Sequence, residues 1–254
     1  MEQILYVPAD KSLVLNRVTK QYGSVLAVDQ VSFMADYREF LAIVGPTGCG
    51  KTTLLRLVAG LEELDGGHIY IHGRCVDDEK PGNRGVRMVF QGNALWPHMR
   101  VFHKDIHSNL SFASKIRRQL PQTIEDKVNT IASRLGIGKN LYPRKPDQLS
   151  AGQEQMVGIG RAMTIRPKIL LLDEPLSNID PQHRLRLRQE LKHFHMEIGA
   201  TTLYVSHNLP EAFSLADRVA FMQEGRIIQI DAPSKIRSHP ANEFVRGFLQ
   251  CFEM

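Results

Sequence analysis

The chain has 254 residues, of which 43% are hydrophobic and 23% charged, enough to bury a sizeable core beneath an ordinary globular surface. No apolar run approaches the roughly 18–20 residues that span a bilayer, and the first ten residues lack the basic end and apolar stretch of a signal peptide. A net charge of +5 is compatible with binding to nucleic acid or to a lipid surface, but a mildly basic soluble protein is the simpler interpretation. We therefore expect a cytoplasmic protein with no nucleic-acid partner.

The N-terminal third alternates short apolar runs with one helix. Strands are predicted at 13–18, 31–34, 40–44, 68–73 and 86–90. The helix starts at Lys51, and its apolar residues recur on one side. From about residue 95 to 165 the chain becomes helical and polar, and the segment 123–136 has apolar residues at helical spacing.

After this middle section the alternation of strands and helices returns. It comprises a strand at 169–172, a helix at 181–198, a strand at 201–205, a helix from Leu209, two strands within 218–230 joined at Glu224 and Gly225, and one or two short helices at the end. Strands that alternate with helices predict a mainly parallel α/β core, which the helical section interrupts.

The run GPTGCGKTT (45–53) fits the pattern G-x-x-x-x-G-K-[ST], follows an apolar strand and opens a helix, which is the context that supports a phosphate-binding loop. Its glycines let backbone N–H groups surround phosphates. Lys51 would place a cation on the β- and γ-phosphates, and Thr52 would put its hydroxyl on Mg²⁺. The predicted ATP contacts in this run are Gly45, Pro46, Thr47, Gly48, Cys49, Gly50, Lys51, Thr52 and Thr53.

Three cysteines, Cys49, Cys75 and Cys251, show no metal-ligand spacing and cannot all pair with one another. Reduced thiols are the simplest account of them. Cys49 lies near the start of the predicted helix, where a thiol's pKa can be lowered. A redox role would follow from such a shift, but a small residue tolerated in the loop is the simpler interpretation.

The run ILLLDEP (169–175) is an apolar strand that ends in two carboxylates. Asp173 is predicted to hold the metal, which leaves Glu174 to polarise the attacking water. The alternative is an Asp-Glu pair that caps a helix before a proline turn. The phosphate-binding loop earlier in the chain disfavours that alternative.

Other polar residues also follow predicted strands. Gln91 comes after RMVF, and His207 comes after TTLYVS. Because ligands of open α/β sheets bind beyond the carboxyl ends of the strands, we predict one site for Gly45, Gln91, Asp173 and His207. A structural histidine is the alternative for His207, and Tyr22 is either an ordinary strand-end tyrosine or an aromatic face that stacks on adenine.

The segment LSAGQ (149–153) predicts a second helix start. Ser150 can cap this helix, and Gln153 follows at the capping-box spacing. A helix N-terminus with Gly152 at its tip can bind an anion, which raises the question of what occupies it.

In their order along the chain these motifs resemble the ATPase subunit of ATP-binding cassette (ABC) transporters over nearly the whole length. The order is Tyr22, GPTGCGKTT, Gln91 in VFQGNALWPHM, LSAGQ, ILLLDEP, SNID (177–180) and His207 in YVSHNLPEAF. The runs AGLEE, ALWPHM, DEPLSNID and EAFSLADRV are more specifically similar to bacterial importer subunits for sugars, polyamines and ferric iron. The C-terminal regulatory domain of many such relatives is expected to be absent.

The resemblance implies a P-loop NTPase (RecA-like) α/β core with an N-terminal antiparallel β subdomain and an inserted helical subdomain. It makes 1–254 a single ABC ATPase domain, with a nucleotide-binding core and β subdomain at 1–94 and 166–230, a helical signature subdomain at 95–165 and a short helical tail at 231–254.

The resemblance also implies a head-to-tail dimer, with a second copy or a homologous ATPase subunit, that encloses two ATP molecules. Ser150, Gly152 and Gln153 would contact the ATP of the partner subunit, and Asp180 would couple the two sites. The implied ligands of Mg²⁺ are Thr52, Gln91 and Asp173, and the implied catalytic residues are the general base Glu174 and the γ-phosphate contact His207.

ATP hydrolysis would then power solute import through an integral-membrane permease contacted by the region from Gln91 to His98, with a separate solute-binding protein. The subunit would lie in the cytoplasm on the inner face of the cell membrane. One alternative is a soluble, non-transport ABC-type ATPase, which the single cassette without coiled-coil insertions disfavours. Another is a regulatory subunit with weak hydrolysis, which the presence of Glu174 and His207 disfavours.

Three features depart from the family pattern. Ala151 stands where the family usually has glycine, which would cost about 1–2 kcal/mol if the position required a positive φ. Met156 stands where a basic residue is common, and the loop at 100–114 is several residues longer than usual. Trp96, the single tryptophan, is predicted to pack either under a helix of the permease or within its own subdomain.

Overall fold

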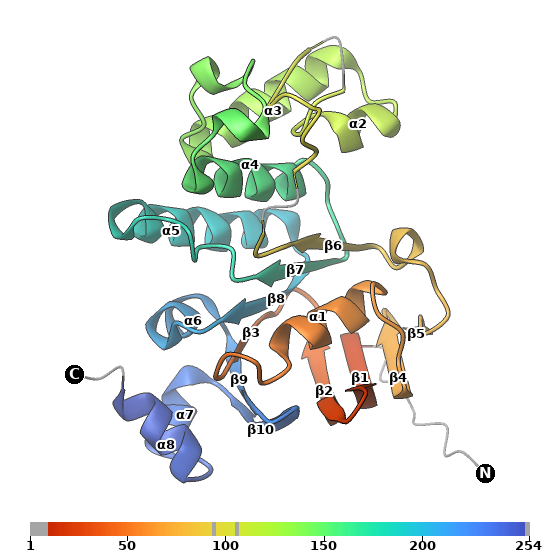
Figure 1. Ribbon diagram of the computed structural model, residues 1–254, viewed down its shortest axis with the longest axis vertical. Helices are drawn as coiled ribbons and strands as arrows, with labels where there is room; N and C mark the ends of the chain where they lie inside the picture. Colours follow the sequence, from red (N-terminus) through yellow and green to blue (C-terminus); the bar gives the residue numbers. More distant parts are fainter. Residues whose placement is uncertain (1–9, 93–94, 105–106, 252–254) are drawn as a thin grey trace. The chain divides into compact units, whose positions relative to one another are not determined.

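The computed structural model describes residues 10–92, 95–104 and 107–251. They form two compact units (Figure 1). The first unit comprises the residues up to 87, 167–173 and those from 199 onward, and the second comprises 88–166 and 174–198. The subdomain boundaries expected from the sequence stay a prediction, and they differ from this division in assigning 174–198 to the nucleotide-binding core.

The first unit contains an antiparallel sheet with the strand order β2-β1-β4-β5. Its strands are β1 (Lys11–Tyr22), β2 (Val25–Asp36), β4 (Gly66–Ile71) and β5 (Arg74–Cys75). β1 pairs antiparallel with both β2 and β4, and its apolar residues Leu13, Leu15 and Val18 are buried. The predicted antiparallel β subdomain is confirmed. β1 and β2 extend beyond the predicted runs, and β4 begins and ends two residues earlier than predicted.

A six-stranded sheet has the order β10-β9-β3-β8-β7-β6. Its strands are β3 (Phe40–Val44), β6 (Val86–Val89), β7 (Ile169–Asp173), β8 (Thr201–Ser206), β9 (Arg218–Gln223) and β10 (Arg226–Asp231). β3 pairs parallel with β8 and β9, and β7 pairs parallel with β8. Every residue of β3, β7 and β8 is buried, as expected for parallel strands covered on both faces. The predicted parallel core is therefore confirmed.

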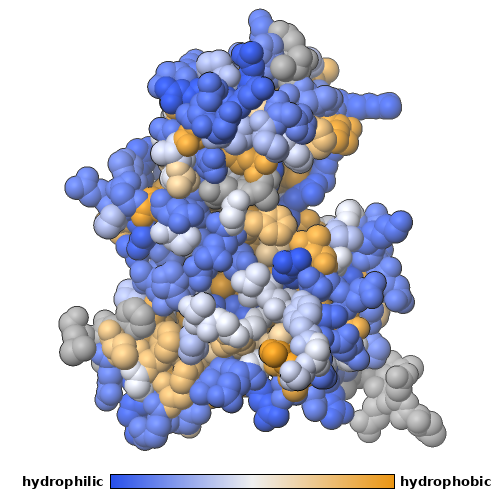
Figure 2. Space-filling model, in the orientation of Figure 1, coloured by the Kyte–Doolittle hydropathy of each residue, from blue (hydrophilic) through white to orange (hydrophobic). Residues whose placement is uncertain are grey.

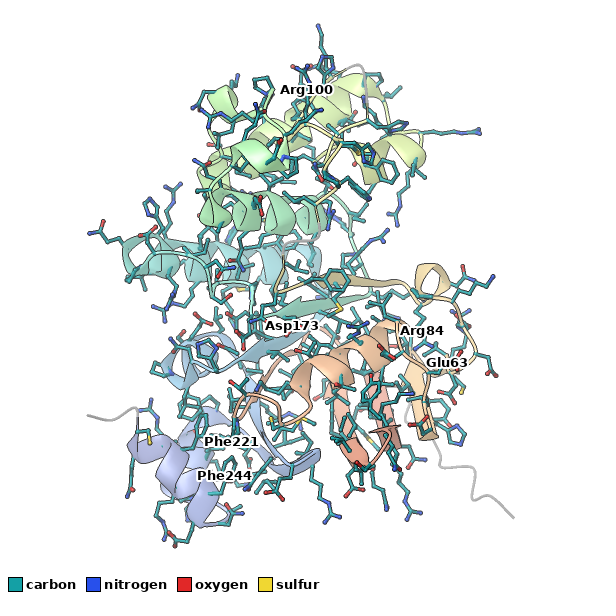
Figure 3. The ribbon with its side chains drawn as sticks, in the orientation of Figure 1. Glu63, Arg84, Arg100, Asp173, Phe221 and Phe244 are labelled. Atoms are coloured by element: carbon teal, nitrogen blue, oxygen red, sulfur yellow. The ribbon has the colours of Figure 1, made fainter. Side chains whose placement is uncertain are left out.

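The helices of the first unit are α1 (Lys51–Ala59), α6 (Leu209–Leu215), α7 (Pro233–Ser238) and α8 (Glu243–Gln250), with a 3-10 turn η1 (Pro81–Asn83). α8 buries Val245 and Leu249, and its Phe248 ring lies edge-on to Phe221 with 5.6 Å between the ring centroids. Phe244 packs on Phe248, and apolar side chains gather over these C-terminal helices (Figures 2 and 3). The C-terminal segment is thus a packed part of the first unit.

The second unit is helical. Its elements are α2 (Phe112–Ile116), α3 (Pro121–Leu135), α4 (Ala151–Met163) and α5 (Pro181–Ile198), with 3-10 turns η2 (Lys139–Leu141) and η3 (Pro146–Gln148). The apolar stripe predicted for α3 is buried, and α4 approaches it closely at Gly160. A Cβ added to Gly160 would lie 3.1 Å from the Leu110 side chain and 3.2 Å from that of Leu135. Within the described parts of the chain, no helix has both the length and the apolar character needed to cross a membrane.

Candidate nucleotide-binding and catalytic site

The loop between β3 and α1 has the backbone shape that a phosphate-binding loop requires. Gly48 has a φ of 80°, and a Cβ added there would meet nothing within 4 Å. Gly50 has a φ of 106°, and a Cβ there would lie 2.1 Å from the carbonyl oxygen of Ala27. Only glycine fits at Gly50 without backbone movement, and the bare backbone at Gly48 faces open space that a phosphate can enter.

Lys51 lies inside this loop and is only 6% exposed. Its Nζ donates hydrogen bonds to the carbonyl oxygens of Gly45 at 2.8 Å and Pro46 at 2.7 Å. These bonds satisfy a buried ammonium that would otherwise be costly. Thr47 belongs to the same loop, and Thr53 to the first turn of α1.

Cys49 is buried in the loop, with its Sγ 3.7 Å from the Lys51 Nζ. Burial raises the pKa of the Cys49 thiol, and the Lys51 ammonium opposes that shift. A lowered pKa was the feature that would favour a redox role, so the direction of the shift agrees with a small residue tolerated in the loop.

The first unit brings Thr52 and Asp173 together although 121 positions separate them. Asp173, labelled in Figure 3, ends β7 and is 2% exposed. Its Oδ1 accepts a hydrogen bond of 3.1 Å from the Thr52 hydroxyl. A hydroxyl and a carboxylate are both hard oxygen donors of the kind that Mg²⁺ prefers. Both side chains were predicted as ligands of Mg²⁺, and that role stays a prediction.

His207 follows β8 in an exposed turn. The residues on either side of it, Ser206 and Asn208, are both hydrogen-bonded to Glu211. The carboxylate of buried Glu211 accepts hydrogen bonds from the Tyr204 hydroxyl and, at 2.9 Å, from the Ser206 hydroxyl. The Asn208 side chain accepts a 3.0 Å bond from the Glu211 N–H and caps α6. Sequence reasoning did not identify Glu211, whose partners lie on a strand and a turn that only the fold brings together.

Tyr22 ends β1 with 44% of its surface exposed. The Lys20 Nζ lies 5.4 Å from its ring centroid, and partial burial together with the Glu62 carboxylate raises the pKa of its hydroxyl. The exposed ring is compatible with stacking on a base, and the adenine contact stays a prediction.

In the second unit the predicted base and one predicted metal ligand are in contact. Gln91 donates a hydrogen bond of 3.2 Å from its Nε2 to Oε2 of Glu174. Glu174 has a φ of 46°, a left-handed conformation that is uncommon for residues other than glycine. Such backbone strain persists where the surroundings hold it and is frequent at functional sites.

Gln155 is one of the residues that hold the Glu174 backbone in this conformation, and sequence reasoning did not identify it. It lies on α4 with no exposed surface, and its Nε2 donates a 3.2 Å bond to the carbonyl oxygen of Glu174. Its Oε1 accepts a 3.1 Å bond from the N–H of Asn178. The Ser177 hydroxyl donates a further 3.0 Å bond to the Glu174 carbonyl. The amide of Gln155 therefore links α4, which begins in the LSAGQ motif and is called the signature helix below, to the turn that follows Asp173.

The LSAGQ segment forms the predicted capping box at the start of α4. The Gln153 N–H donates to the Ser150 hydroxyl at 3.3 Å, and the Ser150 N–H donates to Oε1 of Gln153 at 3.1 Å. Ala151 is the first residue of the helix and has no positive φ, so alanine carries no backbone strain there. A Cβ at Gly152 would lie 3.4 Å from the Asn178 carbonyl oxygen, an ordinary contact distance.

Asp180 precedes α5 and caps it. Its carboxylate accepts a bond of 3.1 Å from the His183 N–H and one of 2.8 Å from the His183 Nδ1. The hydrogen bonds from His183 lower the pKa of the Asp180 carboxyl. Asp180 thus has a structural partner within its own chain, and the proposed coupling role across a dimer is additional to it.

Trp96 packs within the helical unit. Its ring centroid lies 4.4 Å from that of Phe112, and the guanidinium of Arg161 lies 4.6 Å from the same ring. Buried Asn109 accepts a 3.0 Å bond from the Trp96 N–H. These contacts favour the subdomain-packing interpretation of Trp96. Part of the predicted permease contact, residues 93–94, lies outside the described residues, as do 105–106 in the long loop.

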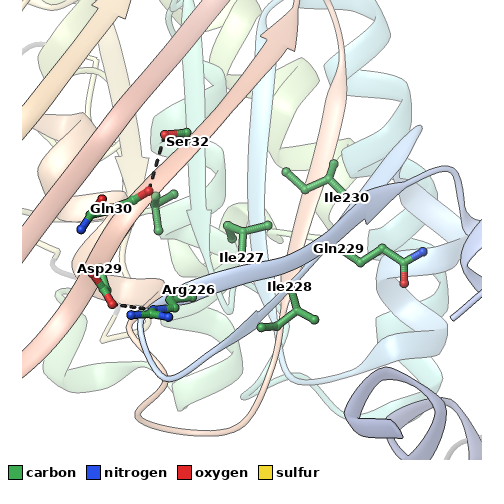
Figure 4. Close-up of a pocket in the computed structure, with 9 residues that line it drawn as sticks. Asp29, Gln30, Ser32, Arg226, Ile227, Ile228, Gln229 and Ile230 are labelled. Carbon is green, nitrogen blue, oxygen red and sulfur yellow. Dashed lines mark hydrogen bonds and ion pairs between the residues drawn. The ribbon is translucent and has the colours of Figure 1, made fainter. Parts of the chain in front are cut away.

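A cleft of about 650 Å³ lies in the first unit along β2 and β10 (Figure 4). It is lined by residues 29–32 and 226–230, and Arg226 forms an ion pair with Asp29 at one end. None of the predicted ATP-binding residues lines this cleft.

Comparisons with known proteins identify the same family that the motifs resemble. A family model described as "ABC transporter" matches residues 28–177. The sn-glycerol-3-phosphate import ATP-binding protein of Cupriavidus necator is 45% identical over 238 residues, which cover 93% of this chain and 63% of that protein. The trehalose/maltose import ATP-binding protein of Thermococcus litoralis is 43% identical over 238 residues, covering 91% of this chain and 62% of that protein. The chain thus spans less than two thirds of the length of these curated relatives.

Solved structures agree with the fold. A dimeric bacterial ABC transporter cassette matches with a TM-score of 0.78 and 25% identity, over 87% of this chain and 98% of that chain. A dimeric cassette in a post-hydrolysis state, bound to ADP and Pi, matches with the same TM-score and coverage and 24% identity. The arrangement of strands and helices described above is therefore that of these cassettes.

Proposed function

Because the chain belongs to the ABC transporter family, we propose that it is an ATP-binding and ATP-hydrolysing subunit that powers solute import through a membrane permease. The observation that carries the proposal is the hydrogen bond between Thr52, at the end of the phosphate-binding loop, and buried Asp173. A loop for phosphates beside a hydroxyl and a carboxylate that can hold a divalent ion is what a nucleotide triphosphatase needs.

In this proposal the loop backbone and Lys51 bind the phosphates of ATP. Thr52 and Asp173, together with Gln91, would hold Mg²⁺, which when bound neutralises phosphate charge. The oxygen atoms of Thr52 and Asp173 are 3.1 Å apart, which fits two neighbouring ligands of one small cation. Tyr22 would stack on the adenine.

Glu174 is assigned the general-base role and His207 the contact with the γ-phosphate. A base must hold its carboxylate toward the attacking water, and the hydrogen bond from Gln91 to Oε2 restricts the orientation of Glu174. Hydrogen bonds of Ser206 and Asn208 with Glu211 similarly restrict the conformation of the turn that contains His207. A preorganised site lowers the cost of reaching the transition state.

We further propose a head-to-tail dimer with two ATP at its interface. The start of α4 combines a helix N-terminus with a glycine, so Ser150, Gly152 and Gln153 can bind an anion held by the partner subunit. One ATP then joins two protein surfaces, and loss of phosphate after hydrolysis releases them. The partner is a second copy or a homologous ATPase subunit.

The proposal of import follows from the relatives, three of which are named for uptake of chemically different solutes. These are sn-glycerol-3-phosphate, trehalose or maltose, and osmoprotective compounds, at 42–45% identity to this chain. Such variety at similar identity is expected if the permease and a separate solute-binding protein select the solute. The chain would then work in the cytoplasm, on the inner face of the membrane.

Recovery of the tagged chain from detergent-solubilised membranes tests this function. We expect an integral-membrane permease to co-purify with it, and ATP-dependent uptake after both are reconstituted in vesicles. A Lys51→Ala chain should co-purify equally well but support no uptake. Recovery with ribosomes or nucleic acid in place of a permease would favour the soluble ATPase, and ATP binding without hydrolysis beside the permease would favour a regulatory subunit.

A further inference from the structure

We propose that His68, Cys75 and Asp77 form a binding site for a divalent transition metal, best suited to Zn²⁺, on the hairpin of β4 and β5. No function assigned above uses these residues. His68 and Cys75 lie on strands of the antiparallel sheet of the first unit, and Asp77 lies in the turn that follows β5. The proposal is independent of the nucleotide chemistry.

The register of the hairpin brings the three side chains to one face. Tyr70 pairs with Cys75 across the two strands, and the Val76 N–H donates to the Ile69 carbonyl oxygen at 2.9 Å. Continuing this register places His68 opposite Asp77. Because side chains alternate between the faces of a strand, Cys75 and Asp77 share one face, and His68 meets them there.

The potential ligand atoms are already close to one another. The His68 Nδ1 lies 2.8 Å from Oδ2 of Asp77, and the Cys75 Sγ lies 3.1 Å from the same oxygen. All three ligand atoms lie within 4.8 Å of one another. Zinc bonds of about 2.0–2.3 Å put neighbouring ligands of a tetrahedral ion roughly 3–4 Å apart, so small side-chain rotations suffice.

Bonds outside the cluster hold Asp77 in position. Its Oδ1 accepts a 2.8 Å bond from the Ile69 N–H, which leaves Oδ2 facing His68 and Cys75. Its backbone carbonyl accepts a 2.9 Å bond from Arg84, whose side chain is almost fully buried. Outer partners of this kind orient metal ligands and are part of a functional metal site.

The donor set selects the kind of metal. An imidazole nitrogen, a thiolate and a carboxylate suit Zn²⁺, whereas Mg²⁺ and Ca²⁺ prefer oxygen ligands alone. The site therefore differs in selectivity from the oxygen pair of Thr52 and Asp173. On binding, the Cys75 thiol gives its proton to the solvent as the sulfur–metal bond forms, and water fills the fourth position. Exposure of Cys75 provides the entry path.

Metal titration of the reduced full-length chain tests the site. The measurements are Zn²⁺ affinity by chelator competition and the Co²⁺ absorption spectrum, both without nucleotide and with excess Mg²⁺ to occupy oxygen-only sites. The variants are Cys75→Ser, His68→Gln and Asp77→Asn, and the last keeps an acceptor for the Ile69 N–H. The matched control is Cys251→Ser, which removes another exposed thiol.

We expect one Zn²⁺ per chain in the unmodified protein and in Cys251→Ser, with a sulfur-to-cobalt charge-transfer band in both. Each of the three site variants should weaken Zn²⁺ binding by more than about tenfold, and Cys75→Ser should abolish the band. Zn²⁺ should raise the melting temperature of the unmodified chain but not of Cys75→Ser. Equal Zn²⁺ affinity in Cys75→Ser, or a band that depends on Cys251, would overturn the proposal. Retained ATP binding by the site variants shows that they fold.

Discussion

Glu174, the proposed general base, also has an unusual backbone conformation. Its left-handed φ of 46° costs about 1–2 kcal/mol for a residue with a Cβ. Hydrogen bonds from Ser177 and Gln155 to its carbonyl hold that conformation, while Gln91 holds its carboxylate. The structure thus orients both the main chain and the side chain of one acidic residue.

A Glu174→Gln substitution should separate ATP binding from turnover. The amide keeps the size of the side chain but cannot accept a proton, so we expect the rate of phosphate release to fall by at least about a hundredfold. ATP affinity should stay within a few-fold, and a dimer should accumulate with ATP on size-exclusion chromatography. Turnover close to that of the unmodified chain would remove Glu174 from the base role.

Replacing Ala151 with glycine should bring no gain in ATP-dependent dimerisation or turnover. Ala151 begins α4 without a positive φ, so the strain that would make glycine advantageous is absent. Glycine should instead lower the free energy of unfolding by up to about 1 kcal/mol, measured by urea denaturation. Ser150→Ala, which removes the cap, should cost about 1 kcal/mol in the same assay. A rise in turnover with glycine would show that a helical alanine impairs the signature.

At the scale of elements, the signature helix is coupled to the turn after Asp173 by one buried amide. Gln155 donates to the Glu174 carbonyl and accepts from the Asn178 N–H, and it is fully buried. A displacement of α4 would break both bonds. A movement of α4 would therefore change the position of the backbone of Glu174, the proposed base.

Gln155→Ala should test that coupling. The substitution removes the side-chain acceptor of the Asn178 N–H and one of the donors to the Glu174 carbonyl, which should cost about 1–3 kcal/mol in the free energy of unfolding. We expect turnover to fall more than ATP affinity, since the phosphate-binding loop is not altered. Gln189→Ala on the exposed face of α5 is the matched control and should change neither quantity. Equal turnover in the two variants would mean that Gln155 serves stability alone.

Much of the element order follows from sequence periodicity. The strand at 40–44 and the helix at 181–198 occur with the predicted boundaries, as β3 and α5. β1 was predicted as 13–18 but runs from Lys11 to Tyr22, because its outer residues are mostly polar, range from buried to exposed and carry little apolar signal. Boundaries are thus clear where a segment is uniformly buried or amphipathic.

Contacts between side chains that only the fold brings together cannot be predicted from the periodicity of apolar residues. Glu211 is predictable as a helix-start residue, but its bonds to Tyr204 and Ser206 depend on the chain returning from β8 into α6. His68, Cys75 and Asp77 meet only through the register of a hairpin whose second strand has two residues. Thr52 and Asp173, which form a hydrogen bond, could both be proposed as metal ligands because motifs, rather than periodicity, single them out.

At the scale of the whole molecule, the proposed function requires two chains. Two of the matching solved structures are dimeric, and the LSAGQ helix start is predicted to serve the ATP of a partner subunit. Each active site would then take its phosphate-binding loop from one chain and its signature from the other. A defect in one motif should therefore be complemented by a chain defective in the other.

Mixing two inactive chains tests this arrangement. Lys51→Ala removes the loop cation, and Gly152→Asp places a negative charge at the predicted anion contact. Each alone should hydrolyse little ATP, whereas their heterodimer retains one intact loop facing one intact signature. Since about half of the dimers in an equal mixture are heterodimers, roughly a quarter of the normal ATPase rate should return. No recovery on mixing would contradict a site shared between chains.

The inward position of Lys51 has a kinetic consequence. Its ammonium bonds the carbonyl oxygens of Gly45 and Pro46, so groups of the chain itself can hold the loop in shape. Phosphate oxygens then replace those carbonyls as acceptors, and the entropy of ordering the loop has been lost on folding rather than on binding. An arriving nucleotide has to redirect one side chain rather than reorganise a loop, which keeps its association rate high.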